Sequence, residues 1–526
     1  MNRGCSFALL SSLVLLLIAP VRAQQSDNKG ENYFGTTFSV EAHDVKQGCR
    51  TAQPIIDANG KVVEEKKPLK VLLPGCLVPI FHGNKGLYGS FANLPPGNSV
   101  ALGALFKDSE LNPGRRKKDG TPSATPWRMY YQIDGQGSFN GSWTAGGFLT
   151  MRLSPTSEAQ QRTSGTAPTS TPVSQPVPPS APTNSTKPIV MLHPPIVHQG
   201  PIKHLRELGE TETKLLLNLY AFHTSLNQVS FFGIGPDTVP ADRSFFAFHE
   251  TITGGSADVL LPFGFHLLGE LNGRWPTVGG GHGQSSPSIE QAYTETTAPG
   301  LTQQPGFLQP GEGLEFNYHG GGIGKTAKIG SDFNLDWTVN FQQFFAPSSS
   351  IYSFRRLTID ATNEFNLLRM FKPKLGSPTP EQFGTLTLRG WLAESIAPAG
   401  HVVPFYFQPT LGGGDIDKDR TLPSFADYRF RAPNALLFTG QYEWPLPKYS
   451  FLGLDFRADT GKMGNARGDI DLSHLRHSYG AGFTVRAGNF PYLVFMYAWG
   501  GGEGHHTFAD VNLSAISSGG GATSLW

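Results

Sequence analysis

The residues whose types and spacing could perform chemistry are few. His319-Gly320-Gly321-Gly322-Ile323-Gly324-Lys325-Thr326 is one residue short of a phosphate-binding loop. Such a loop needs a glycine at the position of His319 and a following helix whose N-terminus binds the phosphate. The residues that follow here are strand-like, so a glycine-rich hairpin turn is the favoured interpretation.

Two further groups fit metal binding or catalysis poorly. His505 and His506 lie beside Glu503 and could hold a metal ion, but a solvated loop is the favoured interpretation. The run Thr253-Gly254-Gly255-Ser256-Ala257 lacks the Gly-x-Ser-x-Gly spacing of a nucleophile elbow. No other spacing of Ser, His and Asp singles out a triad. We therefore expect no enzyme activity, no catalytic residue, no cofactor and no metal.

An alternation of apolar and polar residues recurs from about residue 85 to the C-terminus and defines the elements of the chain. In the run Leu452-Leu454-Phe456-Ala458, the intervening residues include Asp455, Arg457 and Asp459. Strand side chains point to opposite faces with period two, so each such segment has one apolar and one charged face. A soluble sandwich would bury the apolar face. The repeated charged residues on the polar face instead favour a closed barrel, with lipid outside and water inside.

The N-terminus has the features of a secretory signal. Arg3 precedes an apolar stretch from Phe7 to Ile18, and Val21-Arg22-Ala23 is a small-residue cleavage site, so we expect cleavage after Ala23. Beyond the signal no apolar run approaches the roughly 18 residues of a spanning helix, whereas a spanning strand needs only about 9–11. The signal and the strands together predict a location in the bacterial outer membrane, with its lipids as partners.

The balance of charges bears on nucleic-acid binding, and the cysteine content bears on disulfide formation. The chain has 42 Lys and Arg against 41 Asp and Glu, so we expect no nucleic-acid partner. Cys5 leaves with the signal, and Cys49 and Cys76 remain. In an oxidising periplasm such a pair commonly forms a disulfide, and two buried free thiols are an equally open alternative.

The predicted fold class is all-β: a closed antiparallel transmembrane β-barrel of about 16 strands, since such single-chain barrels favour even numbers. The predicted divisions are a signal peptide at 1–23, a short N-terminal periplasmic segment at 24–84, the barrel at 85–526, and within it a Pro/Ser/Thr-rich surface loop at 154–212. The pairing between 254 and 330 is left open. The expected strands are 98–107, 127–133, 139–153, 213–224, 244–253, 336–347, 351–363, 384–395, 402–410, 435–446, 451–460, 478–488, 492–500 and 507–516.

Several segments, in order and spacing, resemble one known family. They include Phe231-Phe232-Gly233-Ile234-Gly235-Pro236-Asp237, Tyr352-Ser353-Phe354-Arg355-Arg356-Leu357 and Tyr442-Glu443-Trp444-Pro445-Leu446, together with a long segment that closes on Phe425-Ala426-Asp427-Tyr428-Arg429-Phe430-Arg431. The set is similar to the bacterial surface-antigen barrels, the barrel domains of BamA- and TamA-type outer-membrane assembly factors. The POTRA modules of those factors have no counterpart, because 24–84 is too short to contain one.

The resemblance implies a role for the segment from Gly412 to Arg431. In the family this is the sixth external loop, which folds back into the lumen and pins its tip with an Arg–carboxylate contact. The family has Arg-Gly at the tip where this chain has Pro423-Ser424, so we expect Arg429 to be the anchor, with Asp459 or Glu443 as the inner-wall carboxylate. The candidate residues of the loop and barrel wall are Phe425, Tyr428, Arg429, Phe430, Arg431, Glu443, Asp459 and Gly461.

The resemblance also implies a function. We expect an integral outer-membrane barrel that assists protein insertion or export through a weak seam between its first and last strands. Its partners would be unfolded outer-membrane or exported proteins and a separate POTRA-bearing periplasmic protein. The alternative is a passive pore or receptor, because a barrel of about 16 strands is wide enough for an aqueous lumen. An outer-membrane enzyme is the least supported alternative.

Overall fold

The computed structural model describes residues 52–56, 62–66, 86–98, 100–111, 114–116, 122–123, 127–153, 215–281, 286–319, 333–367, 384–417, 419–446, 451–487 and 490–511. Several predictions concern other parts of the chain and lie outside the described residues. They are the signal with its cleavage after Ala23, the pairing of Cys49 with Cys76, the surface loop at 154–212, and residues 320–326 of the run that resembles a phosphate loop.

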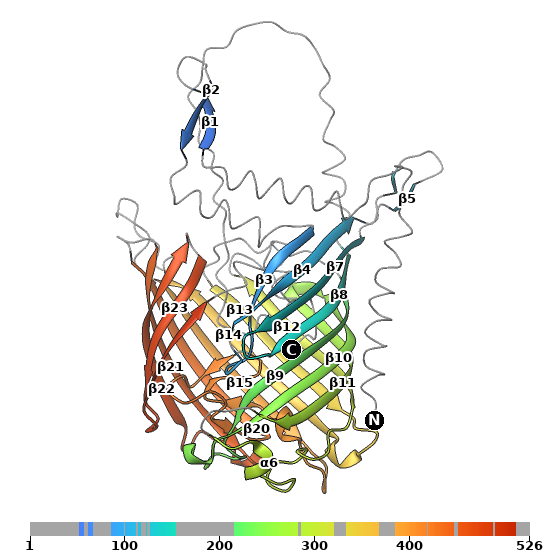
Figure 1. The fold of residues 1–526 in the computed structure, drawn as a ribbon, viewed down its shortest axis with the longest axis vertical. Coiled ribbons are helices and arrows are strands. Elements are labelled where there is room, and N and C mark those ends of the chain that lie inside the picture. The colour runs from blue at the N-terminus through green and yellow to red at the C-terminus, as the bar shows by residue number, and fades with distance from the viewer. Residues whose placement is uncertain are drawn as a thin grey trace, which may run out of the picture.

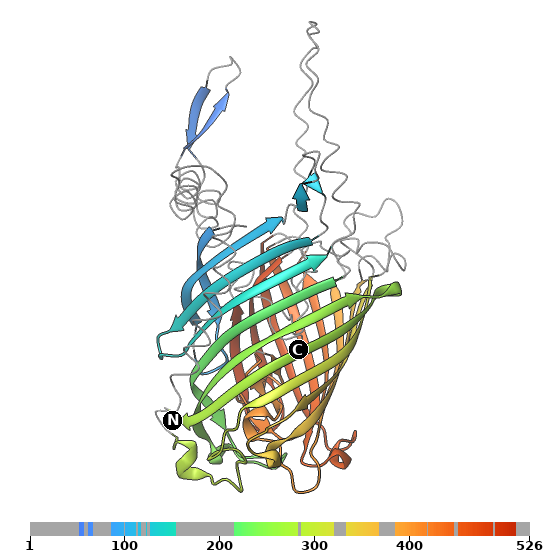
Figure 2. The same ribbon diagram turned by 90° about the vertical axis from the view of Figure 1, so that its right-hand side faces the viewer.

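One antiparallel sheet of 16 strands makes up most of the described chain, so the predicted all-β class and strand number are confirmed. The sheet curls into a barrel-shaped wall (Figures 1 and 2). From β3 to β24, neighbours in sequence are neighbours in the sheet, apart from short strands in the connecting segments. The strands are β3 (Gly86–Asn93), β4 (Val100–Leu111), β7 (Trp127–Ser138), β8 (Trp143–Leu153), β9 (Leu215–Phe231), β10 (Ser244–Leu260), β11 (Phe265–Gly280), β12 (Phe307–His319), β13 (Phe333–Phe344), β14 (Phe354–Asn366), β15 (Thr385–Ile396), β20 (Asn434–Pro445), β21 (Leu452–Gly464), β22 (Arg476–Ala487), β23 (Phe490–Trp499) and β24 (His505–Val511).

Other short elements lie outside this sheet. β1 (Ala52–Ile56) pairs with β2 (Val62–Lys66), and β5 (Gly114–Arg116) pairs with β6 (Pro122–Ser123). A single helical turn, α6 (Ile289–Ala292), lies at one end of the wall (Figure 1). In the described part of the chain, no helix has the length and apolar character needed to cross a bilayer.

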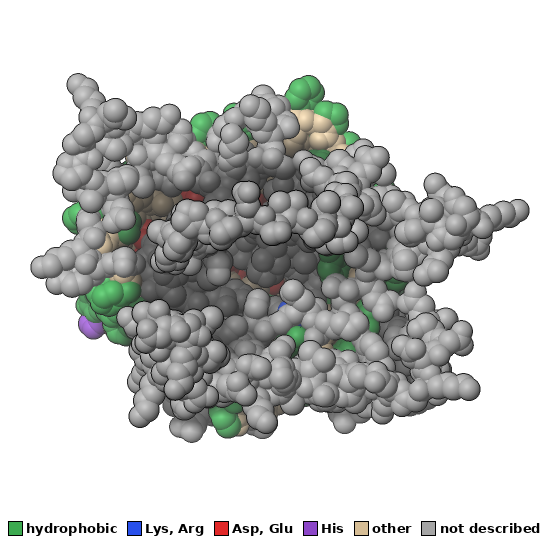
Figure 3. All heavy atoms as spheres, turned by 90° about the horizontal axis from the view of Figure 1, so that it is seen from above, with side chains coloured by type: hydrophobic (Ala, Val, Ile, Leu, Met, Phe, Trp, Pro, Cys, Tyr) green, Lys and Arg blue, Asp and Glu red, His purple; other side chains and the backbone are tan. Residues whose placement is uncertain are grey.

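The sheet buries its charged face and exposes its apolar face, which is the reverse of a sheet in a soluble protein. On β21 the residues Asp455 and Asp459 are 1% and 2% exposed, whereas Phe456 between them is 45% exposed. The predicted separation of charged and apolar faces is therefore confirmed on this strand. Figure 3, viewed from the end opposite α6, shows acidic side chains within the hollow and hydrophobic ones at the outer rim. Exposed apolar side chains recur around the sheet at Leu102, Leu219, Leu267, Leu271, Leu314, Trp337, Leu388, Phe438, Phe483 and Tyr497.

The largest buried apolar cluster lies inside the wall at the α6 end. The cluster contains Ile289 of α6, apolar residues from several strands, and all three residues of a 3-10 turn, η4 (Phe405–Phe407). The expected strand at 402–410 is therefore wrong. Pro404 and Pro409 have no N–H to donate to a ladder, and all three aromatic residues of η4 are buried, so the segment has no exposed face. It packs as a plug of aromatic rings instead.

The region left open between 254 and 330 is now assigned for its described residues. β10 continues to Leu260, β11 follows a short turn, and β12 pairs with both β11 and β13. β9 also runs further than expected, to Phe231. The long strands β9, β10 and β11 are followed in the sheet by β8, β7, β4 and the short edge strand β3 (Figure 2).

Candidate functional site

The segment between β15 and β20 turns back against the inner, polar face of the wall. Within it lie β16 (Thr410–Leu411), β17 (Gly413–Gly414), β18 (Arg420–Thr421) and β19 (Phe430–Arg431), which pair as two short ladders. We call Gly412–Arg431 the inner loop. Its backbone N–H at Ser424 donates to Oγ of Ser478 on β22 at 2.8 Å.

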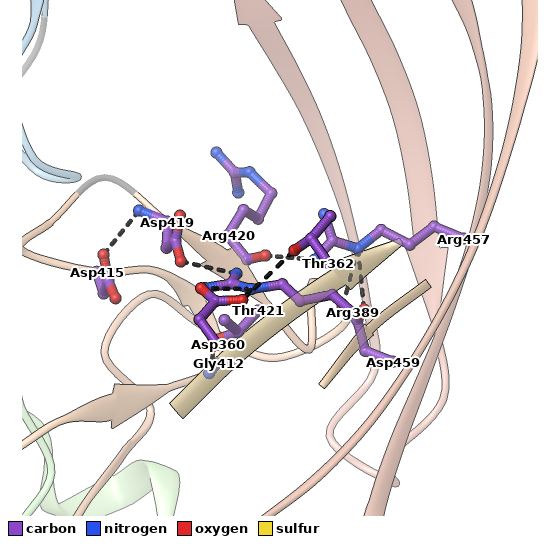
Figure 4. Close-up of polar contacts among 10 residues, drawn as sticks. All are labelled: Asp360, Thr362, Arg389, Gly412, Asp415, Asp419, Arg420, Thr421, Arg457 and Asp459. Atoms are coloured by element: carbon purple, nitrogen blue, oxygen red, sulfur yellow. Dashed lines mark hydrogen bonds and ion pairs between the residues drawn. The ribbon is translucent and has the colours of Figure 1, made fainter. Parts of the chain in front are cut away.

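Arg389 joins the wall to the inner loop. From β15, its Nη2 and Nε donate to the carboxylate of Asp360 on β14 at 2.8 and 3.1 Å, and its Nη1 donates to Asp419 of the inner loop at 2.9 Å (Figure 4). The Arg389 side chain is only 6% exposed. The bidentate contact with Asp360 fixes the Arg389 guanidinium on the wall. Its remaining Nη1 then holds Asp419 of the inner loop close to β14 and β15.

Arg457 forms a second link, on β21. Its Nε donates to both carboxylate oxygens of Asp459 at 3.0 Å, and its Nη2 donates to the backbone carbonyl of Arg420 in the inner loop (Figure 4). Arg457 and Asp459 are two residues apart on one strand and therefore share a face. Because Asp459 is already paired with Arg457, the expectation that it would anchor Arg429 is wrong.

Arg429 pairs with Glu503 instead, in the turn between β23 and β24. Its Nε and Nη2 each lie 2.7 Å from a carboxylate oxygen of Glu503, and its Nη1 donates to Oγ1 of Thr238 at 2.8 Å. The guanidinium also lies over the rings of Phe232 and Phe430, at 5.2 and 4.5 Å. Arg429 is buried and ion-paired, but its partner comes from a turn rather than from Asp459 or from Glu443 on β20.

Tyr428 reaches in the other direction. Its hydroxyl donates to the carbonyl of Pro96, in the turn between β3 and β4, at 3.2 Å. Its φ of 60° is in the left-handed region, which is uncommon for a bulky residue. Burial, and then the charges of Asp415 and Asp427, raise the pKa of Tyr428 well above its ordinary value, so the hydroxyl stays protonated and able to donate.

Adjacent residues of the inner loop thus contact the turns of the first and last hairpins of the sheet. Two further contacts strengthen the connection to the last hairpin. A Cβ added at Gly501 would lie 2.0 Å from the ring of Phe425, so Gly501 gives the room that this ring occupies. The guanidinium of Arg420 lies 4.0 Å from the ring centroid of Phe508 on β24.

The base of the inner loop is fixed by Arg431 and by a close approach at Gly461. Arg431 Nη1 donates to the carbonyl of Phe405 at 2.7 Å, and its own carbonyl accepts from the N–H of Gly235 at 2.7 Å. Burial lowers the pKa of Arg431 to about 10, which leaves it charged near neutral pH. On β21, a Cβ at Gly461 would lie 3.1 Å from the side chain of Leu411, so β16, just before the inner loop, packs directly on the wall there.

These contacts hold the inner loop against the inner face of the wall. In the ranges that the structure describes, no group of three or more His, Cys, Asp or Glu is placed to hold a metal ion. Sequence reasoning missed the roles of Arg389, Asp360 and Pro96, which no local pattern marks. Glu503 was noted beside His505 and His506 as a possible metal ligand, and its role as the partner of Arg429 depends on a fold contact across 74 residues.

Comparison with known proteins finds solved structures that are similar to this chain. BamA from Haemophilus ducreyi lacking POTRA domains 1-3 is 10% identical, with a TM-score of 0.44 over 93% of this chain and 80% of that one. CdiB from Escherichia coli is 10% identical, with a TM-score of 0.41 over 89% and 68%. CdiB from Acinetobacter baumannii is 9% identical, with a TM-score of 0.37 over 93% and 83%. No protein-family model matches the chain, and no curated protein matches it.

Proposed function

We propose that this chain is an outer-membrane β-barrel of the surface-antigen type that assists the insertion or export of other proteins through the seam between β3 and β24. The observation that carries the proposal is a single inner loop that contacts the turns of both end hairpins in an inside-out sheet. Charged side chains buried inside the wall and apolar ones exposed outside it suit a wall surrounded by lipid.

The seam is the natural weak point of such a wall. β3 and β24 stand at the two ends of the sheet order and are, as described, its shortest strands, with 8 and 7 residues. A short strand contributes few ladder hydrogen bonds, so the ends need additional support. The bonds from Tyr428 to Pro96 and from Arg429 to Glu503 supply such support on both sides of the seam.

The passive pore is less well supported than the assembly role. The inner loop crosses the interior and is bound there by Arg389 and Arg457, and the aromatic cluster around Phe405 fills the α6 end. An open aqueous channel needs an interior free of such a plug. Under this proposal the signal at 1–23 is removed, residues 24–84 face the periplasm, and a separate POTRA-bearing protein delivers unfolded clients.

The first experiment tests the barrel itself. Purified protein folded into lipid vesicles is run on gels with and without boiling, because a closed barrel has no free edges and resists detergent until heated. We expect the unboiled sample to migrate faster. Identical migration, together with fractionation as a soluble protein, would refute the barrel.

The second experiment separates assembly from conduction. Planar bilayers are prepared with the wild-type protein and with a variant lacking 415–431, and the same proteins are placed in vesicles with an unfolded reporter barrel. We expect the wild type to conduct little and to accelerate reporter insertion, and the deletion to conduct. High wild-type conductance without any effect on the reporter would favour the passive pore.

A further inference from the structure

The outer face of β8, β9, β10 and β11 carries a polar patch near the α6 end of the wall. Residues directly opposite one another in an antiparallel pair share a face. Register therefore places outward-facing residues in rows across the four strands. One row is Trp143, Ser225, His249 and Thr277, and the next, one step further from the α6 end, is Ala145, His223, Thr251 and Trp275.

Exposure confirms which face these rows occupy. Trp143 and Trp275 are 42% and 46% exposed, and Leu219 and Leu271, on the same face further along, are 50% and 55% exposed. On β9, His223 is four residues from Leu219 within one continuous register, so it points to the same side. The two histidines therefore lie on the outer surface and not in the interior.

Each histidine is oriented by a hydroxyl on the neighbouring strand. Nδ1 of His223 lies 2.8 Å from Oγ1 of Thr251, and Nδ1 of His249 lies 2.8 Å from Oγ of Ser225. These bonds use one edge of each ring and direct the opposite edge, with Nε2, away from the hydroxyl. The ring of Trp143 stacks on that of His223 at 4.7 Å and fixes it further.

The surroundings of the pair change from polar to apolar along the strands. The next row away from the α6 end is small, with Gly147, Ala221, Thr253 and Gly273. The row after it contains Leu149, Leu219 and Leu271. Going away from the α6 end, the outer face presents histidines and tryptophans, then small residues, then leucines. This order matches the head group, ester region and acyl chain of a lipid.

We infer that this patch binds the phosphate group of a membrane lipid, with the imidazoles of His223 and His249 as hydrogen-bond donors. Neither polar row contains a carboxylate, so an anionic group meets no like charge there. Trp143 and Trp275 flank the head group. The ring of Trp275 covers Gly273, where an added Cβ would lie 2.6 Å from it, so an acyl chain lies along Gly147, Ala221 and Thr253 toward the leucines. The inference rests on the proposed membrane-spanning barrel, but not on its role in assembly.

The test uses the full chain folded in a sugar-head-group detergent, which carries no phosphate. Native mass spectrometry measures retention of a phosphatidic acid, of a diacylglycerol with the same chains, and of inorganic phosphate. The same measurements are made on His223→Ala/His249→Ala and on a matched control, His505→Ala/His506→Ala, which removes two exposed histidines from β24.

We expect the wild type and the control to retain the phosphatidic acid and the double variant at the patch to bind it about tenfold more weakly, since two hydrogen bonds to an anion are lost. Equal retention by the patch variant, or equal binding of the diacylglycerol, overturns the inference. Inorganic phosphate that displaces the lipid at equal concentration shows a free-anion site and contradicts a lipid ligand.

Folding is checked separately by heat-modifiable migration. If the alanine variant does not fold, His223→Asn/His249→Asn replaces it, because an amide can keep the bond to the neighbouring hydroxyl. A wild-type protein that never becomes heat-modifiable speaks against the proposed barrel, whereas a folded barrel that retains no phosphatidic acid speaks against the lipid site alone.

Discussion

Arg429 and Glu503 form a bidentate ion pair inside the wall, with each of two guanidinium nitrogens 2.7 Å from a different carboxylate oxygen. The arginine side chain is 1% exposed and the glutamate side chain 19%. Because the arginine belongs to the inner loop and the glutamate to the last hairpin, the pair couples the position of the loop to that of one edge of the sheet.

Breaking this pair from either side should destabilise the folded barrel. Glu503→Gln and Arg429→Met should each cost about 2–5 kcal/mol, because the remaining partner is left buried and uncompensated. The double variant should cost less than the sum of the two. Urea titration of protein in vesicles gives all three free energies of unfolding, and strictly additive costs would show that the two side chains are not coupled.

The outer face should reject charge. Phe456→Arg places a guanidinium at an apolar, exposed position of β21 and should cost about 2–4 kcal/mol if the site lies near the bilayer midplane. The matched control is Thr358→Arg on β14, which faces the interior and should be milder. Refolding into vesicles followed by denaturant titration makes the comparison, and equal costs would mean that the assignment of faces is wrong.

Arg457 and Asp459 should behave as a unit. Arg457→Leu leaves the Asp459 carboxylate, whose side chain is 0% exposed, without its partner, and should cost about 3–5 kcal/mol. Arg457→Leu/Asp459→Leu removes both charges and should be less damaging than the single change. If the double variant is the worse of the two in thermal unfolding, burial of an unpaired carboxylate is not the cause.

The α6 end should lose order in acid through Glu295. Burial by itself would raise the pKa of this carboxyl, but donation from the N–H of Gly300 and Thr302 and from the hydroxyls of Tyr352 and Thr302 holds the pKa below its ordinary value of 4.5. A carboxyl whose folded-state pKa is lowered in this way stabilises the fold fully above its ordinary pKa of 4.5. That stability is lost as the pH falls through the lower folded-state pKa.

Limited proteolysis of the 286–306 loop between about pH 6 and pH 3 measures this loss, with the range set by the carboxyl pKa. We expect the wild type to become sensitive toward the acid end. Glu295→Gln should be more sensitive than wild type near neutral pH and should change less with acid. A wild-type profile that is flat across the range would contradict the role of the carboxylate.

The sequence by itself determined the strands of the wall and the direction in which their side chains point. Side-chain alternation is a local property, and each run such as Leu452 to Ala458 carries its own two faces whatever its neighbours do. The strand class, the strand number and the inward direction of Asp455, Arg457 and Asp459 could therefore be predicted. The predicted strand at 402–410 was wrong. The aromatic residues around Phe405 favour a strand, but Pro404 and Pro409 have no N–H to donate to a neighbouring strand.

Only the tertiary structure decided which side chains meet inside the wall. The bond from Tyr428 to Pro96 spans 332 positions and the pair of Arg429 with Glu503 spans 74. Neither contact has a local signature, since a turn carbonyl and an exposed-looking glutamate carry no pattern of their own. Curling of the sheet brings its first and last hairpins to the same inner loop, and partner choice there depends on which carboxylates the wall has already paired, as Arg457 does with Asp459.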